Sequence, residues 1–343
     1  MKLSAQINQE LPFVIYKKPN SGRLHIWQQT TSGLYTDEDL KTPGFYFTPF
    51  STDQNPSVVF PEIHKKEQDF LIREFETGQK NQIHPVVTDQ ILADMHQEKV
   101  AKAIALIKQG NLDKMIVSRK QRLDFDAFFS FDALLRLMQH YDESFVYMWH
   151  HPKIGTWIGA TPELLVSIAH DKLQTMALAG TLPVQKGEPV IWSAKEINEQ
   201  QIVTDYIARK LSDFSDRVNV GIPQTVYQGK LAHIKTMLTA VVQPKNMVKI
   251  IKQLHPTPAV CGLPTGLAKK YIAEIESYNR KYYTGFLGII SKEQADLYVN
   301  LRSMEVHADH LDLYVGGGIV LDSVPEKEWQ ETCIKSHVLL SIL

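Results

Sequence analysis

The stretch FVYMWHHPKIGTWIGATPELLVSIAHDKLQTMALA, residues 145–179, decides the fold class. It contains four runs rich in aromatic and aliphatic residues with turn residues between them, and each run predicts a strand. The predicted strands span 145–149, 155–159, 164–168 and 173–179. A helical pattern, 188–211, begins only after the fourth strand. Strands grouped in this way favour an α+β fold with mostly antiparallel sheet over a doubly wound parallel sheet.

The remaining elements follow the same grouping. Before residue 60, β-prone runs at 13–16 and 24–27 flank turn residues and predict hairpins. Residues 62–85 are polar and charged, and we expect a mobile connection there. From residue 89 apolar residues recur at helical spacing, and Gly110 is the expected C-cap. Further strands are predicted at 115–118, 284–290, 297–301 and 311–315, and further helices at 248–253, 267–277 and 326–342.

Composition and charge argue against several classes of protein. The chain has 343 residues, 43% of them hydrophobic, which is enough for a large core. Its 37 basic and 38 acidic residues leave a formal charge of −1, so we expect no nucleic-acid partner and no attraction to an anionic membrane. No secretory signal is visible, and no run approaches the ~20 apolar residues of a membrane span. Two isolated cysteines, Cys261 and Cys333, fit a cytoplasmic protein.

Two pairs of glutamates are the first candidates for a functional site. Glu196 and Glu199 lie three residues apart in a predicted helix, which places both on one face. Glu328 and Glu331 repeat that spacing near the C-terminus. Two such faces brought together would suit Mg²⁺, which proteins hold through one or two carboxylates plus water and substrate oxygens. The alternative for either pair is a solvated charged face.

Three further features each allow two interpretations. Lys114, at the start of a predicted buried strand, is either a surface lysine or a desolvated amine with a lowered pKa, and Glu163 raises the same question for a carboxyl group. The glycines at 316–318 follow a predicted strand without the spacing of a dinucleotide-binding loop, which indicates a tight turn or a close backbone approach. The thirteen histidines are scattered and do not predict a zinc site.

A series of short motifs covers about two thirds of the chain, from Leu112 to the C-terminus. In order they are KMIVSR (114–119), GATPELL (159–165), AGT (179–181), KEINE (195–199), LHPTPA (254–259) with GLP (262–264), YTG (283–285), LRS (301–303), GGGI (316–319) and DSVPE (322–326). In this order they resemble the chorismate-utilising enzymes, a family that includes anthranilate synthase component I. The resemblance is closest to the isochorismate synthases.

The resemblance implies the large α+β fold of anthranilate synthase component I. Residues 1–88 would form a β-rich N-terminal region of that fold, and residues 89–343 the chorismate-binding catalytic region. The implied reaction converts chorismate to isochorismate, an isomerisation in which water attacks C2 and the C4 hydroxyl leaves. The implied cofactor is Mg²⁺, and no glutaminase subunit is expected.

The resemblance also implies roles for individual residues. Lys114 would be the general base that activates water, and Glu163 the general acid that protonates the departing hydroxyl. The substrate would be held by five further residues, namely Thr181 and His255 beside the ring, and Arg302, Lys335 and the backbone of Gly316 at a carboxylate.

The metal ligands implied by the resemblance are the glutamates already singled out. Glu199 and Glu331 would coordinate Mg²⁺ directly, and Glu196 and Glu328 would lie nearby or act through water.

Three positions depart from the common pattern of the family. Gln200 stands where histidine is common, LPV at 182–184 replaces a frequent RPR, and Lys281 stands where glycine is usual.

Two positions bear on the choice of nucleophile. Anthranilate synthases typically have glutamine where Lys114 stands, and aminodeoxychorismate synthases often have a nucleophilic lysine in place of Ala179. Lys114 together with the inert Ala179 therefore indicates water rather than ammonia. The alternatives are a salicylate synthase that goes on to eliminate pyruvate, an aminating subunit, and a binding protein without catalytic activity. The residues leave open whether the product would feed menaquinone, a siderophore or salicylate.

Overall fold

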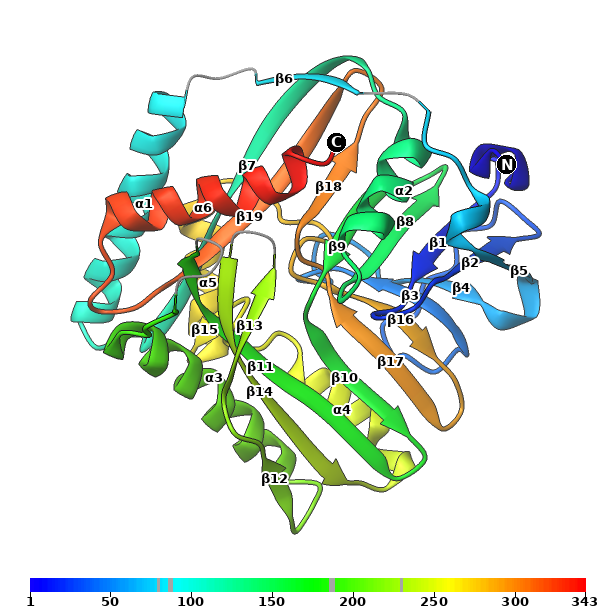
Figure 1. Cartoon of the computed structure of the whole chain (residues 1–343). Helices are drawn as coiled ribbons and strands as arrows, with labels where there is room; N and C mark the ends of the chain where they lie inside the picture. Colours follow the sequence, from blue (N-terminus) through cyan, green and yellow to red (C-terminus); the bar gives the residue numbers. More distant parts are fainter. Residues whose placement is uncertain (79–80, 86–88, 185–188, 229–230) are drawn as a thin grey trace.

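Two large antiparallel sheets flanked by helices form the fold of this computed structural model (Figure 1). It describes residues 1–78, 81–85, 89–184, 189–228 and 231–343. The predicted α+β class with mostly antiparallel sheet is confirmed. None of the helices in the described part of the chain is long and apolar enough to cross a membrane.

The first sheet has ten strands in the order β15-β7-β19-β18-β9-β8-β1-β2-β5, and β6 also pairs with β7. Its strands are β1 (Phe13–Lys17), β2 (Arg23–Gln29), β5 (Lys65–Leu71), β6 (Gln82–Pro85), β7 (Lys114–Ala127), β8 (Phe145–His151), β9 (Gly155–Thr161), β15 (Gly262–Leu263), β18 (Ser303–Val306) and β19 (His310–Ile319).

The second sheet has nine strands in the order β12-β14-β11-β10-β17-β16-β3-β4, and β13 also pairs with β14. Its strands are β3 (Gly44–Thr48), β4 (Val58–Pro61), β10 (Leu164–Ala169), β11 (Lys172–Pro183), β12 (Val218–Val220), β13 (Gln224–Gln228), β14 (Leu231–Val241), β16 (Phe286–Ile290) and β17 (Gln294–Val299). Strands from the first 88 residues thus join both sheets. The predicted region boundary at residue 88 lies outside the described residues.

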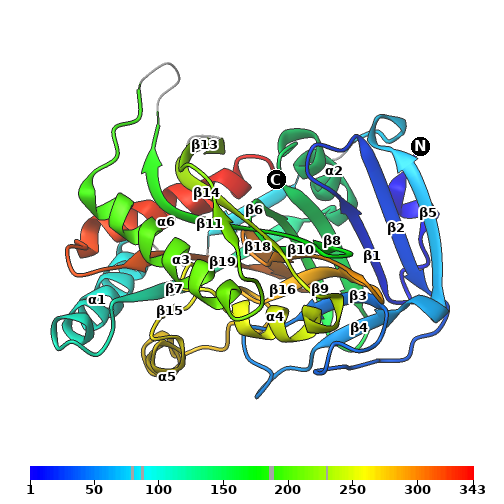
Figure 2. The same ribbon diagram turned by 90° about the horizontal axis from the view of Figure 1, so that it is seen from below.

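Six α-helices lie in the described part of the chain. They are α1 (Asp89–Lys108), α2 (Ser130–His140), α3 (Ala194–Ser212), α4 (Met247–Leu254), α5 (Thr265–Glu276) and α6 (Pro325–Leu340). Helices α1 and α6 pack against each other and against β19 (Figures 1 and 2). The predicted cap of α1 is confirmed, because Gly110 has a φ of 75° and donates a hydrogen bond to the carbonyl oxygen of Ile107.

Several predicted elements need correction. The connection predicted at 62–85 is wrong for residues 65–71, which form β5 and pair with β2 along their whole length, and for residues 82–85, which form β6 and pair with β7. The charged composition of β5 suits its place at the edge of the first sheet, where charges discourage pairing with another chain. The helix predicted from residue 188 begins at Ala194, capped by the Ser193 side chain, while residue 188 itself lies outside the described residues. Neither β14 nor α2 was among the predicted elements.

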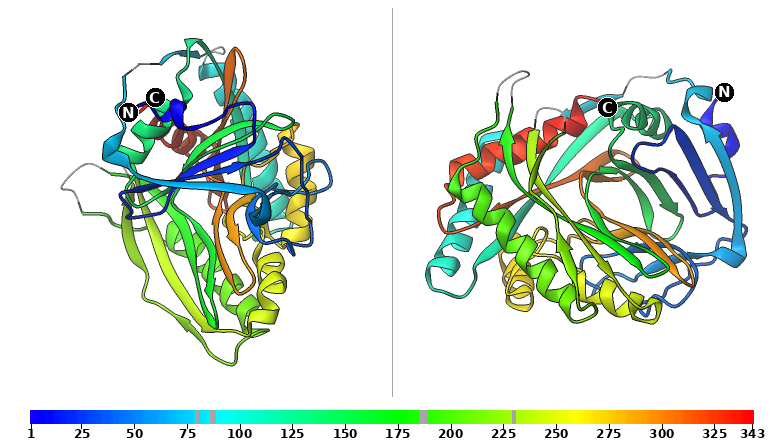
Figure 3. Two further views of the ribbon diagram at one scale, coloured as in Figure 1. Left: turned by 90° about the vertical axis from the view of Figure 1, so that its right-hand side faces the viewer. Right: turned by 60° about the horizontal axis from the view of Figure 1, so that its bottom comes forward.

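The two sheets lie face to face (Figure 3). An aromatic layer joins them. Phe47 of the second sheet stacks on Trp149 of the first, with 4.5 Å between ring centroids, and on Tyr282 at 4.3 Å. Each large aromatic residue removes on the order of 150–250 Å² from water, so this layer fixes the sheets relative to each other.

The chain crosses between the sheets several times, and two of these crossovers are adjacent. After β9, Pro162 and Glu163 lead into β10 of the other sheet, and the chain returns from β17 to β18 through residues 300–302. Backbone hydrogen bonds join the two crossovers, since Val299 N donates to Glu163 O (2.9 Å) and Ala160 N donates to Arg302 O (3.1 Å). Two residues far apart in sequence, Glu163 and Arg302, are thereby held close together.

Candidate active site

One cavity brings most of the predicted site residues together. Its lining combines the two crossovers with parts of β11, α3, β14, β19 and α6. Six predicted residues line it, namely Glu163, Thr181, Glu199, Arg302, Gly316 and Lys335. They were predicted from separate motifs. They meet because the two crossovers, the strands β11 and β19 and the helices α3 and α6 all reach this cavity.

Glu163 is a buried acid in this lining. Its backbone N–H donates to Thr161 Oγ1 (3.3 Å), and its carbonyl oxygen accepts from Val299, so its position is fixed by the crossover. Burial raises the pKa of Glu163 to about 8, although the positive charges of Lys114 and Lys335 act in the opposite direction. Glu163 is therefore largely protonated near neutral pH and is able to donate a proton.

Arg302 is oriented by a histidine that was not predicted. Its Nη2 lies 3.0 Å from His233 Nε2, and since a guanidinium only donates, that nitrogen must accept. The proton of His233 is then on Nδ1, which faces Gly180 O (3.3 Å) and Thr181 Oγ1 (3.2 Å). Burial and the charges of Arg302 and Lys335 hold the pKa of His233 well below its usual range, which keeps it neutral. Arg302 Nη1 is buried without a hydrogen-bond partner and is free to bind a ligand carboxylate.

Lys114 is a desolvated amine rather than a surface lysine. Its side chain is fully buried, and Nζ lies 3.0 Å from Glu199 Oε1 without making a hydrogen bond. Lys114 is not among the described residues that line the cavity, but it is directly behind the lining. A Cβ built on Gly318 would lie 2.9 Å from Lys114 Cε and 2.1 Å from Glu199 Oε1.

The glycines at 316–318 do not form the turn that their composition allows. They lie inside β19 and pair with residues 116–118 of β7. Side chains here would occupy the space that the glutamates use, because a Cβ on Gly317 would lie 3.3 Å from Glu331 Oε1 and 3.5 Å from Glu328 Oε2. The close approach therefore requires glycine.

Three glutamates gather over this glycine strand, and each has a lysine partner. Glu199 contacts Lys114, Glu328 Oε1 accepts from Lys195 (2.7 Å), and Glu331 Oε1 accepts from Lys335 (2.7 Å), which also donates to the carbonyl oxygen of Gly316 (3.1 Å). Burial, together with the charge of Glu331, raises the pKa of Glu328. Glu328 Oε2 is buried without a hydrogen-bond partner. An unpaired oxygen within a set of acids fits a divalent cation such as Mg²⁺.

Glu196 and Gln200 are engaged within the protein. Both oxygen contacts of Glu196 are local, because Oε2 accepts from the backbone N–H and the hydroxyl of Ser193 and completes the capping box of α3. Gln200 Nε2 donates to the hydroxyls of Thr204 (2.8 Å) and Thr236 (2.7 Å) and so ties α3 to β14. These contacts give a structural reason for a neutral side chain at position 200.

His255 is not among the described residues that line the cavity. His255 is half-buried, its ring packs edge-on against Phe286 at 5.0 Å, and neither of its buried ring nitrogens has a side-chain or backbone hydrogen bond of good geometry. The histidine in the cavity is His233 on β14. No residue pattern marked His233, because its role depends on the pairing of β14 with β11, which places it opposite Thr181.

Comparison with known proteins agrees with this geometry. The family described as chorismate binding enzyme matches residues 46–343. Isochorismate synthase MenF of Escherichia coli K12 is 30% identical over 250 residues, which are 70% of this chain and 58% of MenF. Isochorismate synthase DhbC of Bacillus subtilis 168 is 30% identical over 317 residues, 85% of this chain and 78% of DhbC.

A solved structure shares the fold over nearly the whole chain. The crystal structure of a putative 2,3-dihydroxybenzoate-specific isochorismate synthase, DhbC from Bacillus anthracis, superposes with a TM-score of 0.83. The match covers 98% of this chain and 97% of that one at 24% identity. With the family match spanning most of the sequence, the chain belongs to the chorismate binding enzyme family.

Proposed function

We propose that this chain is an isochorismate synthase, which adds water at C2 of chorismate and removes the C4 hydroxyl. The observation that carries the proposal is one cavity that combines a buried, largely protonated Glu163 with an unpartnered donor for an anion, Arg302 Nη1, and with Lys114 directly behind its wall. The isochorismate synthases among its relatives support the same reaction.

The donors of the cavity suit a carboxylate of the substrate. Arg302 Nη1 is free of protein partners, and His233 holds the guanidinium in place through Nη2. Lys335 reaches the same cavity from α6. Together they would bind one carboxylate of chorismate, with Thr181 beside the ring.

Lys114 and Glu163 would carry out the proton transfers. Lys114 would take a proton from the attacking water, since its Nζ is fully buried directly behind the cavity wall, 3.0 Å from Glu199 Oε1. Glu163 would give its proton to the C4 hydroxyl, which then leaves as water. Positioned acids and bases typically contribute about 10²–10⁴-fold each.

Glu199 and Glu331 would hold Mg²⁺, and Glu328 adds an unpaired buried oxygen to the same set. Bound Mg²⁺ would supply positive charge that offsets a substrate carboxylate. The chain's own contribution is the side-chain-free strand at 316–318, which leaves room for oxygens of Glu199, Glu328 and Glu331 beside the glycines.

Product analysis tests the proposal. We expect the pure protein with chorismate and Mg²⁺ to form isochorismate, and ¹⁸O-labelled water to place its oxygen at C2. The same product is expected in ammonium at high pH, since Lys114 is proposed to activate water as the nucleophile. Salicylate with pyruvate would show the further elimination, whereas an aminated product, or no ¹⁸O at C2, would contradict the proposal.

The pH dependence tests the role of Glu163. A general acid must be protonated, so kcat/KM is expected to fall as the pH rises through the pKa of about 8. Glu163→Gln should lower kcat by roughly 100-fold or more and abolish this alkaline decline. Measuring kcat/KM against pH for both proteins decides it. An unchanged alkaline limb in Glu163→Gln would assign the titration to another group.

A further inference from the structure

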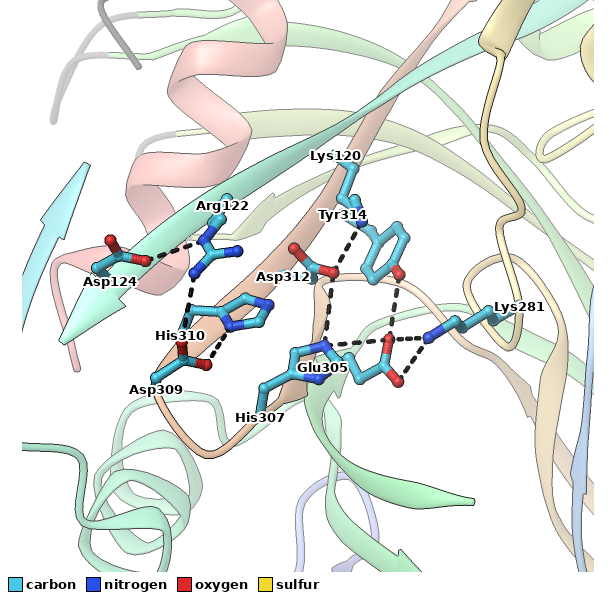
Figure 4. A network of polar contacts seen from close by, with 10 residues as sticks. All are labelled: Lys120, Arg122, Asp124, Lys281, Glu305, His307, Asp309, His310, Asp312 and Tyr314. Carbon is cyan, nitrogen blue, oxygen red and sulfur yellow. Dashed lines mark hydrogen bonds and ion pairs between the residues drawn. The ribbon is translucent and has the colours of Figure 1, made fainter. Parts of the chain in front are cut away.

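A second polar cluster lies on the hairpin of β18 and β19, outside the proposed active site (Figure 4). Glu305 and Asp312 are directly opposite each other on the two strands, and both are buried. Each carboxylate has a lysine partner, Lys281 for Glu305 (2.8 Å to both oxygens) and Lys120 for Asp312 (2.9 Å). Two like charges at neighbouring positions of a sheet are destabilising without such partners.

Two histidines at the end of this hairpin face the carboxylates. His307 Nε2 lies 3.5 Å from Asp312 Oδ2 and 3.6 Å from Glu305 Oε2, and it is buried without a hydrogen-bond partner. The rings of His307 and His310 stack with centroids 4.2 Å apart. His310 Nδ1 lies 2.6 Å from Asp309 Oδ1, so the carboxylate holds the proton on Nδ1 and leaves Nε2 as an acceptor.

We propose that His307, His310 and Asp312 bind a divalent transition-metal ion of the Zn²⁺ class, with Glu305 as the fourth ligand. One ligand atom from each of the first three residues lies within 4.8 Å of the others. In a tetrahedral zinc site, ligand atoms at about 2.0–2.2 Å from the ion are roughly 3.3 Å apart. The distances of 3.5 and 3.6 Å around His307 Nε2 therefore need only a small contraction.

The surroundings of His310 agree with metal binding. Histidines that bind metals usually donate their other N–H to a carboxylate, which is the contact between His310 and Asp309. Imidazole nitrogens with carboxylate oxygens suit Zn²⁺ and its neighbours, whereas Mg²⁺ prefers oxygen ligands alone. This cluster would thus select a different ion from the glutamates over the glycine strand.

The lysines are competitors for the ion. Asp312 Oδ2, the oxygen nearest His307, is also the oxygen that Lys120 contacts, so an ion would displace the ammonium. Lys120 is 38% exposed and is able to turn into solvent. Removing its charge should therefore strengthen metal binding, which a purely structural ion-pair network would not predict.

Titration with Co²⁺, a spectroscopic substitute for Zn²⁺, tests the site in the full chain. The chain is freed of metal and titrated in excess Mg²⁺, which occupies the glutamate set. We expect one equivalent of Co²⁺ to bind with tetrahedral visible bands that Zn²⁺ abolishes. His307→Gln and His310→Gln should each weaken binding at least about tenfold, and Lys120→Met should strengthen it.

His84→Gln is the matched control, because His84 also lies beside an aspartate, Asp126 at 3.1 Å, and should leave Co²⁺ binding unchanged. Circular dichroism and thermal melting without metal establish that each variant is folded, and Asp312→Asn replaces any histidine variant that is not. Equal Co²⁺ affinity in the folded His307, His310 and Asp312 variants overturns the proposal. Co²⁺ binding that is lost in Glu199→Gln instead would also overturn it. The site does not depend on the proposed reaction, since no substrate enters the measurement.

Discussion

Replacing Glu199 by glutamine is expected to lower kcat/KM for chorismate by about three orders of magnitude, or about 4 kcal/mol of transition-state stabilisation. The substitution keeps the shape of the side chain and removes its charge. Glu199 lines the cavity and contacts Lys114, so the loss would affect both the proposed Mg²⁺ set and the environment of the proposed base. Glu331→Gln should have an effect of similar size, because Glu331 also belongs to the set.

Two measurements separate a lost metal ligand from a lost fold. Exhaustive chelation should abolish the activity of the unaltered enzyme, and added Mg²⁺ should restore that activity. Added Mg²⁺ should not restore the activity of either variant. Glu326→Gln, an exposed residue on the same helix as Glu331, is the matched control and should keep near-normal rates. Thermal melting reports on folding. Full activity after chelation, or near-normal kcat/KM in Glu199→Gln, would contradict the assigned ligands.

The fold was predictable where the periodicity of a segment matched its burial. The run at 145–179 forms four strands as expected, because each apolar run is buried between the sheets or beneath a helix. The segment at 65–71 was misjudged because edge strands carry charges, as loops do. The pairing of β9 with β18, and of β11 with β14, joins segments far apart in the chain, and no local pattern contains that information.

The types of residue in the candidate site were predictable from the sequence, but the contacts between their side chains were not. Motif order indicated six residues that line the cavity but not His233, whereas an ion pair such as Lys195 with Glu328 depends on the tertiary fold, which brings the first turns of α3 and α6 near each other. Lys281 illustrates the same point. It has a φ of 51°, which explains why glycine is usual there, and its ammonium neutralises Glu305. The histidines of the chain form no recognisable metal-binding pattern in the sequence, yet the β18–β19 hairpin stacks the rings of His307 and His310.

Lys114→Ala is expected to lower kcat by roughly two orders of magnitude or more, with a smaller change in KM. The reason is that water, unlike ammonia, needs a base beside it near neutral pH, and Lys114 Nζ is the buried amine adjoining the cavity. A base acts in the transition state, so its loss should reduce the rate of the bound complex more than the affinity for chorismate. Steady-state kinetics at saturating Mg²⁺ give both constants.

Truncating any buried lysine disturbs packing, and Lys17 provides the matched control for that effect. Its side chain is also fully buried and ion-paired, with Asp142 at 3.1 Å, but it belongs to β1 and is not among the described residues that line the cavity. Lys17→Ala should therefore lower the melting temperature while leaving the kcat of the folded protein near normal. Lys114→Ala should lower kcat at temperatures where melting shows it fully folded. If Lys114→Ala instead raised KM and left kcat intact, Lys114 would be a substrate-binding residue, and the base that activates water would have to be sought elsewhere in the cavity.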